Sequence, residues 1–440
     1  MKRFIYAIGA FILIFKVSDT YSQQTGDSTL ANATLENCVS YALTHQPTIR
    51  QSLIDQEITE RQIKSKLADW YPQINFDGNY QHNFQLQKSK FGDQIVQLGT
   101  DHTSALQFSL NQNLFNRDVL LASKSAGDVR KQAKQTTSSN KIDIGVSVSK
   151  AFYDVLLSQQ QIKVLDEDIV RLERSLKDAY NQYQGGIVDK VDYKRATISL
   201  NNTKAQKKSS SELMKAKLAY LKQQMGYPDS LALKLQYDSV KMEQSVAFDT
   251  SAMADYQSRI EYQLLQTQQR LLQANLKYYK WSYIPTVSAF ASYNVNYLDN
   301  SFGKLYSTSY PNSYAGVKLN IPIFQGMKRV HNIKQAELQL KRLDYDFISL
   351  KNQVNTEYET ALASYKSNYN DYVVLKDNLE LARDVYNTIQ LQYKSGIKTY
   401  LEVITAETDL RTSQLNYTNA LYQVLSSKLD VQKALGAIQY

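Results

Sequence analysis

The strongest constraint on the fold is one helical turn that occurs twice, half a chain apart. The segment "QYQGGIVDKVDYKRATISL" covers residues 182–200, and "QYKSGIKTYLEVITAETDL" covers residues 392–410. An ungapped alignment superimposes identical residues of the two segments: Tyr183 on Tyr393, Gly186 on Gly396, Ile187 on Ile397, Ala196 on Ala406 and Leu200 on Leu410. The chain is therefore expected to carry an internal duplication, with an equivalent helical hairpin in each half.

Apolar side chains at alternating spacings of three and four residues precede each of the two turns. Those before the first turn are Ile162, Leu165, Ile169, Leu172, Leu176, Ala179 and Tyr183. Those before the second turn are Tyr372, Leu375, Leu379, Ala382, Tyr386, Ile389 and Tyr393. A spacing of this kind over several turns predicts a coiled-coil seam. An ordinary helical bundle would show the same stripe, but over a shorter length.

Few residues interrupt the segments that carry these stripes. Between Asp118 and Tyr183 few residues disfavour a helix, among them Gly127 and the polar run "TTSSN", and the segment from Lys328 to Tyr393 is similarly uninterrupted. Each segment predicts a helix of ~65 residues, or roughly 100 Å. Shorter helices are predicted at Leu35–Trp70, Val191–Met225, Tyr256–Ser282 and Leu401–Leu435. Because two short helices placed end to end match one long helix, we expect a rod of coiled helices.

Each half also has two segments in which apolar and polar residues alternate. The predicted strands cover about 72–83 and 104–115 in the first half, and about 285–297 and 313–324 in the second. A period of two indicates β-strands, and ~10–12 residues is enough to cross a bilayer when the strand is tilted. Pro72 and Pro285 mark the helix-to-strand junctions, because the residue before a proline disfavours the helical conformation.

The polar positions of these strands carry mainly Asn, Gln, Ser and Thr, a pattern typical of a wall with lipid outside and water inside. A soluble sandwich with one buried face is the alternative. Four strands per chain close neither structure, and an open sheet is unstable in a membrane, so several chains must share one barrel. The expected fold class is an α+β membrane protein. Three copies would give a β-barrel of about 12 strands, four from each chain, enough for a water-filled or partly filled lumen.

The N-terminus "MKRFIYAIGAFILIF" has two basic residues and a short apolar run, which predicts a signal peptide over residues 1–22 and export from the cytoplasm. A retained membrane anchor is the alternative. No later apolar stretch reaches the ~20 residues of a transmembrane helix. The single cysteine, Cys38, excludes a disulfide within the chain. The net charge of +9 is spread over helical segments as solvated faces, so no nucleic-acid partner is expected.

These elements divide the mature chain into a first repeat, residues 23–226, and a second repeat, residues 256–440. The tip turns fall at about 184–190 and 394–400. A segment at 227–255 joins the repeats, and within it "LALKLQY" (231–237) alternates, which predicts a short strand around the middle of the rod.

With this order of elements the chain resembles the TolC-like outer-membrane efflux family over essentially the whole mature sequence. The motifs that carry the resemblance are Pro72, Pro285, "IPIF" (321–324), the turn segment "YKSGIKTYLEVITAETDL", and "VQKALG" (431–436) echoed by "KQQMG" (222–226). The resemblance implies a homotrimer whose barrel spans outer-membrane lipid and continues as an α-helical barrel across the periplasm. It also implies that the two turns form the periplasmic tip, where the channel narrows and meets a periplasmic adaptor protein.

Two carboxylates, Asp192 and Glu402, each lie six residues after a turn glycine. The resemblance implies that acids at these places face the pore, where a ring of carboxylates favours cations. Both acids also fit the third position of a helix, so helix capping is an equally good interpretation. Where members of the family often have a second acid, this chain has Arg195 and Thr405, so an acidic ring here is thinner or partly neutralised.

The turn glycines, Gly185, Gly186 and Gly396, suit a hairpin that needs positive φ. Turn geometry alone explains them. Their exposed neighbours are the candidates for contact with the adaptor: Ile187, Val188, Ile397 and Lys398.

The sequence predicts no catalytic residue, no metal site and no cofactor. Four histidines, His45, His82, His102 and His331, are scattered over helix, strand and loop, and no pair has ligand spacing along the chain. No phosphate-binding loop, nucleophile elbow or zinc-binding helix motif occurs. The 33 tyrosines are expected to fill helix interfaces and membrane belts. An enzyme carried on an outer-membrane barrel is therefore disfavoured.

The implied function is the outer-membrane channel of a tripartite efflux or secretion system. Such a channel is a passive gated conduit, coupled to a periplasmic adaptor and to an inner-membrane transporter of the proton-driven (RND) or ABC class. The alternative is a periplasmic coiled-coil adaptor or structural protein without a pore, and the four bilayer-length strands argue against it. The exported substrate is not predicted.

Overall fold

The computed structural model describes residue 30 and residues 33–187, 189–251 and 255–440. The signal peptide expected at 1–22 lies outside this part of the chain, and so does Val188. Helices account for 67% of the structure and strands for 15%. The fold is therefore a mixture of long helices and a smaller sheet.

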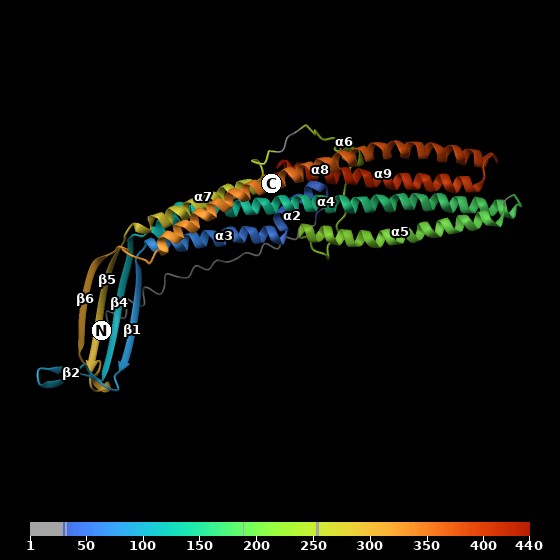
Figure 1. Cartoon of the computed structure of the whole chain (residues 1–440). Helices are drawn as coiled ribbons and strands as arrows, with labels where there is room; N and C mark the ends of the chain where they lie inside the picture. The colour runs from blue at the N-terminus through green and yellow to red at the C-terminus, as the bar shows by residue number, and fades with distance from the viewer. Residues whose placement is uncertain (1–29, 31–32, 188, 252–254) are drawn as a thin grey trace.

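A long bundle of helices is attached at one end to a curved sheet (Figure 1). The elements of the first half are α2 (Leu35–His45), α3 (Pro47–Leu67), β1 (Gln73–His82), β4 (His102–Phe115), α4 (Arg117–Gln184) and α5 (Lys190–Met225). Those of the second half are α7 (Ile260–Lys280), β5 (Thr286–Asp299), β6 (Ser309–Asn320), α8 (Lys328–Lys394) and α9 (Tyr400–Ala434). The minor elements are η2 (Ala68–Trp70), β2 (Gln87–Phe91), β3 (Gln94–Leu98), α6 (Ser239–Gln244), η3 (Trp281–Tyr283) and η4 (Phe302–Lys304).

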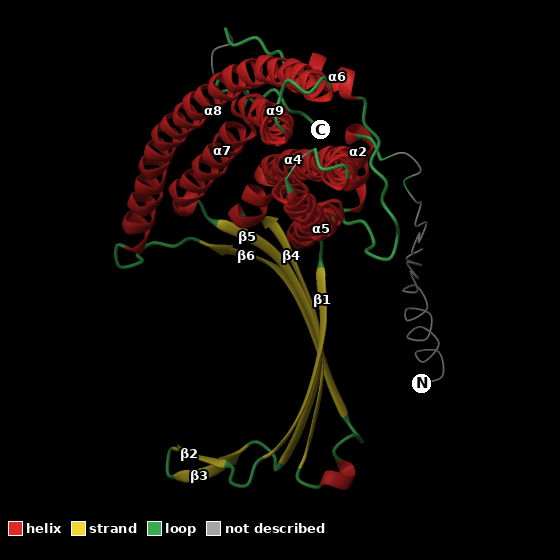
Figure 2. Ribbon diagram, turned by 90° about the vertical axis from the view of Figure 1, so that its right-hand side faces the viewer, coloured by secondary structure: helices red, strands yellow, loops and turns green. Residues whose placement is uncertain are grey.

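The four long strands form one antiparallel sheet in the order β1-β4-β5-β6, with β1 and β6 at its edges (Figure 2). The register places apolar residues opposite one another on one face: Phe76–Phe108, Leu106–Val295, Leu110–Ala291 and Ala289–Val317. The other face pairs polar residues: Asn75–Ser109, Gln107–Asn294 and Asn294–Asn312. The sheet is thus two-sided, apolar on one face and polar on the other.

The long helices α4 and α8 bury seam residues at intervals of seven. In α4 these are Leu165, Leu172 and Ala179, and in α8 they are Tyr372, Leu379 and Tyr386. When the two halves are aligned at the offset of their turns, the buried residues of α8 match Ile162, Ile169 and Leu176, the other members of the 3-4 pattern. The two hairpins therefore bury opposite members of the same seam.

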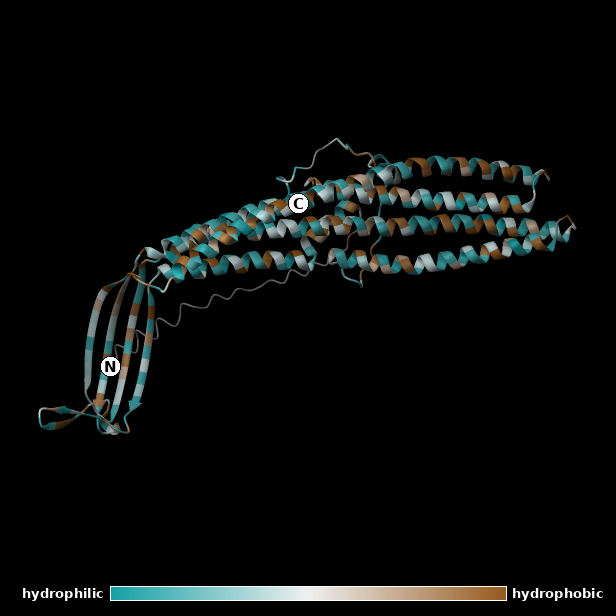
Figure 3. Ribbon diagram, viewed as in Figure 1, coloured by the Kyte–Doolittle hydropathy of each residue, from teal (hydrophilic) through white to brown (hydrophobic). Residues whose placement is uncertain are grey.

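Hydrophilic and hydrophobic residues are interspersed along all the long helices (Figure 3). None of the described helices combines the length and the apolar character that a membrane span needs.

The shorter helices meet end to end through two glycines in the left-handed conformation. Gly226, at the end of α5, has φ 67°, and a Cβ there would lie 2.9 Å from the Cα of Gln46. Gly436, just after α9, has φ 69°, and a Cβ there would lie 2.7 Å from the Oγ of Ser258. Because neither site leaves space for a side chain, α5 ends against the start of α3, and α9 ends against the start of α7.

The structure corrects two sequence expectations and adds one hairpin. The helix expected at Leu35–Trp70 is broken at Gln46, which is extended (φ −63°, ψ 127°) because Pro47 follows it and begins α3. The loop between the first two long strands contains the hairpin β2–β3. The strand expected at 231–237 is a single parallel bridge between Leu235 and Ala33.

Pro72 and Pro285 lie at equivalent junctions between a 3-10 turn and a long strand. The preceding residues, Tyr71 and Ile284, are extended, with ψ 156° and 136°. Each junction lets the chain leave the helical rod and enter the sheet without an intervening loop.

Candidate functional site: the hairpin tips and the charges between them

The two hairpin turns have the same backbone. Gly186 and Gly396 have φ 72° and 74°. The N–H of Gly186 donates to the carbonyl of Tyr183 at 3.0 Å, and the N–H of Gly396 donates to that of Tyr393 at 3.0 Å. These bonds end both helices in the manner of a Schellman motif, for which glycine in the left-handed region is favoured.

The expectation of positive φ at Gly185 is wrong. Gly185 has φ −79°, a value open to any residue, and the equivalent position in the second turn is Ser395 with φ −86°. Beyond the glycines, the side chains of Ile187 and Ile397 are 76% and 71% exposed. Each turn therefore presents an apolar side chain at the extreme end of the molecule.

Both carboxylate oxygens of Glu402 accept hydrogen bonds from residues close in sequence. Its Oε2 accepts hydrogen bonds from the backbone N–H and the hydroxyl of Thr399, at 2.9 and 3.0 Å. Its Oε1 accepts from the Nζ of Lys398 at 2.6 Å. The Lys398 ammonium, followed by the Thr399 hydrogen bonds, lowers the pKa of Glu402 to about 2. Glu402 completes a capping box at the start of α9.

Asp192 occupies the matching position on α5 but has different surroundings. The N-cap of α5 is Asp189, whose carboxylate accepts from the N–H of Val191 at 2.8 Å. Within the described part of the chain, the carboxylate of Asp192 accepts no hydrogen bond and forms no ion pair. Burial, and after it the charges of Asp192 and Asp178, raise the pKa of Tyr393. Asp192 is therefore the acid of the pair whose charge is not neutralised locally.

The two residues that follow these acids by one helical turn also differ. The hydroxyl of Thr405 donates to the carbonyl of Leu401 at 2.9 Å, a bond within α9. Arg195 is exposed and has no ion pair among the described residues. At the four positions compared, the described residues thus place an unpaired acid and an unpaired base on α5, and a paired acid and a neutral hydroxyl on α9.

Two contacts join the tips of the hairpins. The hydroxyl of Tyr393, on α8, donates to the Oε1 of Gln182, on α4, at 2.7 Å. Tyr400 is 2% exposed and packs against Ala179 and Ala196 of the first hairpin. The tip of α8–α9 is therefore bound to that of α4–α5 by a hydrogen bond and an aromatic contact.

A buried charged cluster joins the same hairpins farther from the tip. Asp168, fully buried on α4, lies 18 residues before Gly186, roughly 27 Å along the helix. Its Oδ1 accepts from the Nη2 of Arg171 at 3.1 Å, and its Oδ2 accepts from the Nη1 of Arg411, on α9, at 3.0 Å. Arg411 also donates to the hydroxyl oxygen of Thr203, on α5, at 2.9 Å. Three helices are thus tied to one carboxylate.

Glu407, on α9, is the incompletely paired member of this cluster. It is 2% exposed, and neither of its carboxylate oxygens has a hydrogen-bond partner among the described residues. The nearest cationic atom is the Nε of Arg171, 3.6 Å from Oε1. Burial, and then the charge of Asp168, raise the pKa of Glu407 to about 7. Burying a carboxylate whose oxygens accept no hydrogen bond is costly, so Glu407 is a destabilising group within the cluster.

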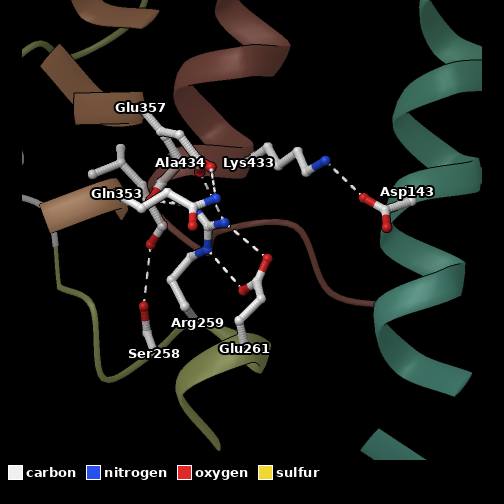
Figure 4. Close-up of polar contacts among 9 residues, drawn as sticks. Asp143, Ser258, Arg259, Glu261, Gln353, Glu357, Lys433 and Ala434 are labelled. Carbon is white, nitrogen blue, oxygen red and sulfur yellow. Dashed lines mark hydrogen bonds and ion pairs between the residues drawn. The ribbon is translucent and has the colours of Figure 1, made fainter. Parts of the chain in front are cut away.

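A second charged junction lies where α7, α8 and α9 meet (Figure 4). Arg259, at the start of α7, binds both carboxylate oxygens of Glu261 at 2.8 and 3.0 Å, and its Nη2 lies 3.1 Å from the Oε2 of Glu357 on α8. Its Nη1 donates to the carbonyl of Ala434 at the end of α9, at 3.2 Å. Lys433 pairs with Asp143 on α4 at 2.7 Å. Arg259 is fully paired, so this junction is structural and fixes the stacked helix ends.

Known proteins are similar to this chain over most of its length. The family described as "Outer membrane efflux protein" matches residues 38–227 and 257–437. The relative "Outer membrane protein TolC" of Salmonella enteritidis is 21% identical over an alignment of 437 positions, which covers 94% of this chain and 84% of the relative.

Solved structures of two outer-membrane proteins share the fold. The structure of CusC aligns with a TM-score of 0.73 at 15% identity, covering 91% of each chain. The open state of the MtrE outer membrane channel of Neisseria gonorrhoeae aligns with a TM-score of 0.71 at 16% identity, covering 91% of this chain and 88% of MtrE. At this level of identity the likeness concerns the fold alone.

Proposed function

The chain belongs to the outer membrane efflux protein family, and from this we propose that it is a passive conduit whose periplasmic end is gated by its two helical hairpins. The protein is an outer-membrane efflux channel that extends into the periplasm. The sheet then lies in the outer membrane and the helical rod beneath it. The observation that supports a conduit best is the two-sided sheet, apolar on one face, polar on the other and unpaired at both edges.

The shared barrel is the first part of this proposal. Unpaired edges are not tolerated in lipid, so β6 of one chain pairs with β1 of the next. Three chains with four strands each give about 12 strands, enough for a water-filled or partly filled lumen. The helical part offers a matching interface, because α8 leaves large apolar side chains exposed: Leu338, Tyr345, Ile348, Val373, Leu381, Val385 and Leu391. A homotrimer buries these residues.

The gate is the second part of the proposal. The Asp168–Arg411 ion pair and the Tyr393–Gln182 hydrogen bond both join α4 to the α8–α9 hairpin. Widening the tip by moving one hairpin past the other breaks these contacts and brings water to Glu407. Asp192 lines the constriction as an uncompensated charge, whereas Glu402 caps α9.

Coupling to other proteins is the third part of the proposal. The exposed Ile187 and Ile397, with Val188 and Lys398 beside them, form the contact with a periplasmic adaptor, and an inner-membrane RND or ABC transporter supplies the energy. The chain itself performs no catalysis. Its relatives differ in cargo, because one is named a toluene efflux pump protein and another a cation efflux system protein. The conduit fold does not by itself select the cargo.

The two halves, residues 23–226 and 256–440 joined by 227–255, are proposed to be copies of one ancestral unit. Both have the order helix, strand, strand, long helix, return helix. The Schellman turns at Gly186 and Gly396 and the left-handed caps at Gly226 and Gly436 recur at one constant offset. In a trimer, two hairpins per chain give a tip with pseudo-sixfold symmetry.

Single-channel recording in a planar bilayer tests this function. The purified protein is expected to form a small, cation-preferring conductance. Asp192→Asn should enlarge the conductance or reduce the cation preference, while Glu402→Gln should change selectivity less, because its charge is already paired with Lys398. Absence of conductance, from protein that also fails to form trimers in detergent, would contradict the proposal.

A further inference from the structure

The strands end far from the helices at one end of the sheet (Figure 2), and the ladder register places two histidines opposite each other there. His82 is the last residue of β1, His102 is the first residue of β4, and the two are directly opposite in the ladder. Their rings lie 4.5 Å apart with an angle of 25° between them. The two Nδ1 atoms are 3.2 Å apart. Spacing along the sequence does not reveal this pair, because it depends on the register of the strands.

Two oxygen atoms lie beside these nitrogens. The hydroxyl of Tyr80 is 2.8 Å from the Nδ1 of His102, and the carbonyl oxygen of Asp101 is 3.1 Å from the Nδ1 of His82. Each nitrogen therefore has two polar neighbours. A neutral imidazole nitrogen has either one N–H or one lone pair in its ring plane, so hydrogen bonds satisfy only part of this set.

The spacing of the nitrogens fits one metal ion. Two imidazole nitrogens that bind Zn²⁺ at tetrahedral angles, each at about 2.1 Å, are roughly 3.4 Å apart. The observed separation of 3.2 Å is close to this value. Because the rings are nearly parallel, a rotation about each Cβ–Cγ bond is needed to turn both lone pairs toward a common point. Tyr80 and the Asp101 carbonyl can then fill the remaining positions.

Aromatic rings surround the histidines. The ring of Phe84 lies edge-on to His82 at 4.8 Å. Phe302, in η4 between β5 and β6, lies edge-on to His102 at 5.8 Å and to Tyr80 at 5.6 Å. These rings border the donor side chains on two sides, and His82 itself remains exposed, so an ion can reach the nitrogens from solvent.

We propose that His82 and His102, with Tyr80 and the Asp101 carbonyl, bind a divalent transition-metal ion of the Zn²⁺, Cu²⁺ or Ni²⁺ class. Imidazole is a preferred ligand of these ions, whereas Ca²⁺ and Mg²⁺ require sets of oxygen ligands. The two histidines flank residues 83–101, which carry the β2–β3 hairpin. A bound ion therefore fastens this hairpin at its base, on the apolar face of the sheet and at the end opposite the periplasmic rod. This site is separate from the conduit and its tip.

Isothermal titration calorimetry with ZnCl₂ tests the proposal on the full chain, purified in detergent through a tag that contains no histidine. One Zn²⁺ per chain is expected for the wild type. His82→Ala and His102→Ala should each weaken binding at least roughly tenfold, and Tyr80→Phe should weaken it by a smaller factor. The matched control is His331→Ala, since His331 is exposed in the first turn of α8, which begins at the helix side of the sheet, opposite the end that carries His82 and His102.

A second readout separates metal binding from an effect on folding. The Cu²⁺-loaded wild type should give an electron paramagnetic resonance spectrum with coupling to two nitrogens, and this signal should be lost in the double variant His82→Ala/His102→Ala. All variants should keep the elution volume and the helical circular dichroism of the wild type. The proposal is overturned if the wild type binds no Zn²⁺, or if the double variant binds as well as His331→Ala. The test of metal binding does not depend on conductance measurements, so a negative result would not contradict the proposed channel function.

Discussion

At the scale of single residues, equivalent positions in the two halves have taken different roles. Glu402 is enclosed by Lys398 and Thr399, whereas Asp192 at the matching place accepts no hydrogen bond from the described residues. In the sequence, the two acids occupy equivalent positions of the repeat, and nothing distinguishes their roles. Their difference arises because Asp189 already caps α5, which leaves Asp192 available.

Removing the cap at Glu402 should destabilise the second hairpin. Glu402→Ala is expected to lower the free energy of unfolding by about 1 kcal/mol, because the capping box loses two hydrogen bonds. Denaturant unfolding followed by circular dichroism measures the change. Asp409→Ala, which removes an exposed acid of the same helix, is the control and should change stability by less than about 0.5 kcal/mol. Equal effects of the two substitutions would contradict the capping role.

The buried Glu407 predicts a pH-dependent stability. Its pKa is raised from 4.5 to about 7 in the folded protein, so the folded state binds the extra proton between these values. Stability is therefore greatest below pH 4.5 as far as this group is concerned, and it falls as pH rises toward 7. At pH 7 the ionisation of Glu407 lowers the free energy of unfolding by roughly 3 kcal/mol. The charged groups around it are Asp168, Arg171, Arg411 and, from α8, Tyr386.

Thermal melting between pH 5 and pH 8 measures this effect. The wild type should lose stability over this range, and Glu407→Gln should flatten the dependence, because glutamine has no proton to exchange. Asp409→Asn is the control and should keep the slope of the wild type. A variant Glu407→Gln that retains the full slope would show that another group causes it.

The cluster around Asp168 could not have been predicted from the sequence. Asp168 and Arg411 are 243 positions apart, and each lies on an otherwise regular helical pattern. The one available signal was local: Asp168 follows the seam residue Leu165 by three positions, so an acid was placed on the buried side. The tip turns were easier to predict, because their glycines lie within each turn and the two turn segments resemble each other in sequence.

At the scale of the elements, periodicity predicted most of the structure. The two long helices and the first three long strands lie where the 3-4 and period-two patterns place them. The fourth strand, predicted at about 313–324, is Ser309–Asn320, so it begins earlier and ends before "IPIF". The break at Gln46 was missed although Pro47 signals it, because the apolar pattern continues across the break. The β2–β3 hairpin was missed because its strands have only five residues each, too few for a clear alternation.

Substitution of a left-handed glycine tests whether the shorter helices are stacked end to end. Gly226→Ala should destabilise the protein by at least about 2 kcal/mol, because it combines a strained backbone with a Cβ placed 2.9 Å from the backbone of Gln46. Gly127→Ala is the matched control, since a Cβ there meets no atom within 4 Å and α4 is helical. This control should stabilise the helix by roughly 0.5–1 kcal/mol. Denaturant unfolding compares the two, and a neutral Gly226→Ala would refute the stacking.

At the scale of the whole molecule, the two faces of the sheet should respond oppositely to charge. Phe108→Lys places a cation on the apolar face and should cost about 2–4 kcal/mol of insertion, which is measured as loss of trimer in outer-membrane fractions. Ser109→Lys, one residue along β4 and on the polar face, should be inserted normally and should reduce the cation preference in planar bilayers. Equal loss of trimer in both variants would argue against a lipid-facing and a water-facing side.

The unpaired edges of the sheet, β1 and β6, also have a genetic consequence. If each barrel is completed by neighbouring chains, a subunit with a damaged edge strand disrupts every trimer that contains it. In a cell that expresses equal amounts of intact and damaged subunits, random mixing leaves only about one trimer in eight wholly intact. Mutations in β1 or β6 should therefore be dominant over a normal copy of the gene, whereas mutations that prevent a chain from being made should be recessive.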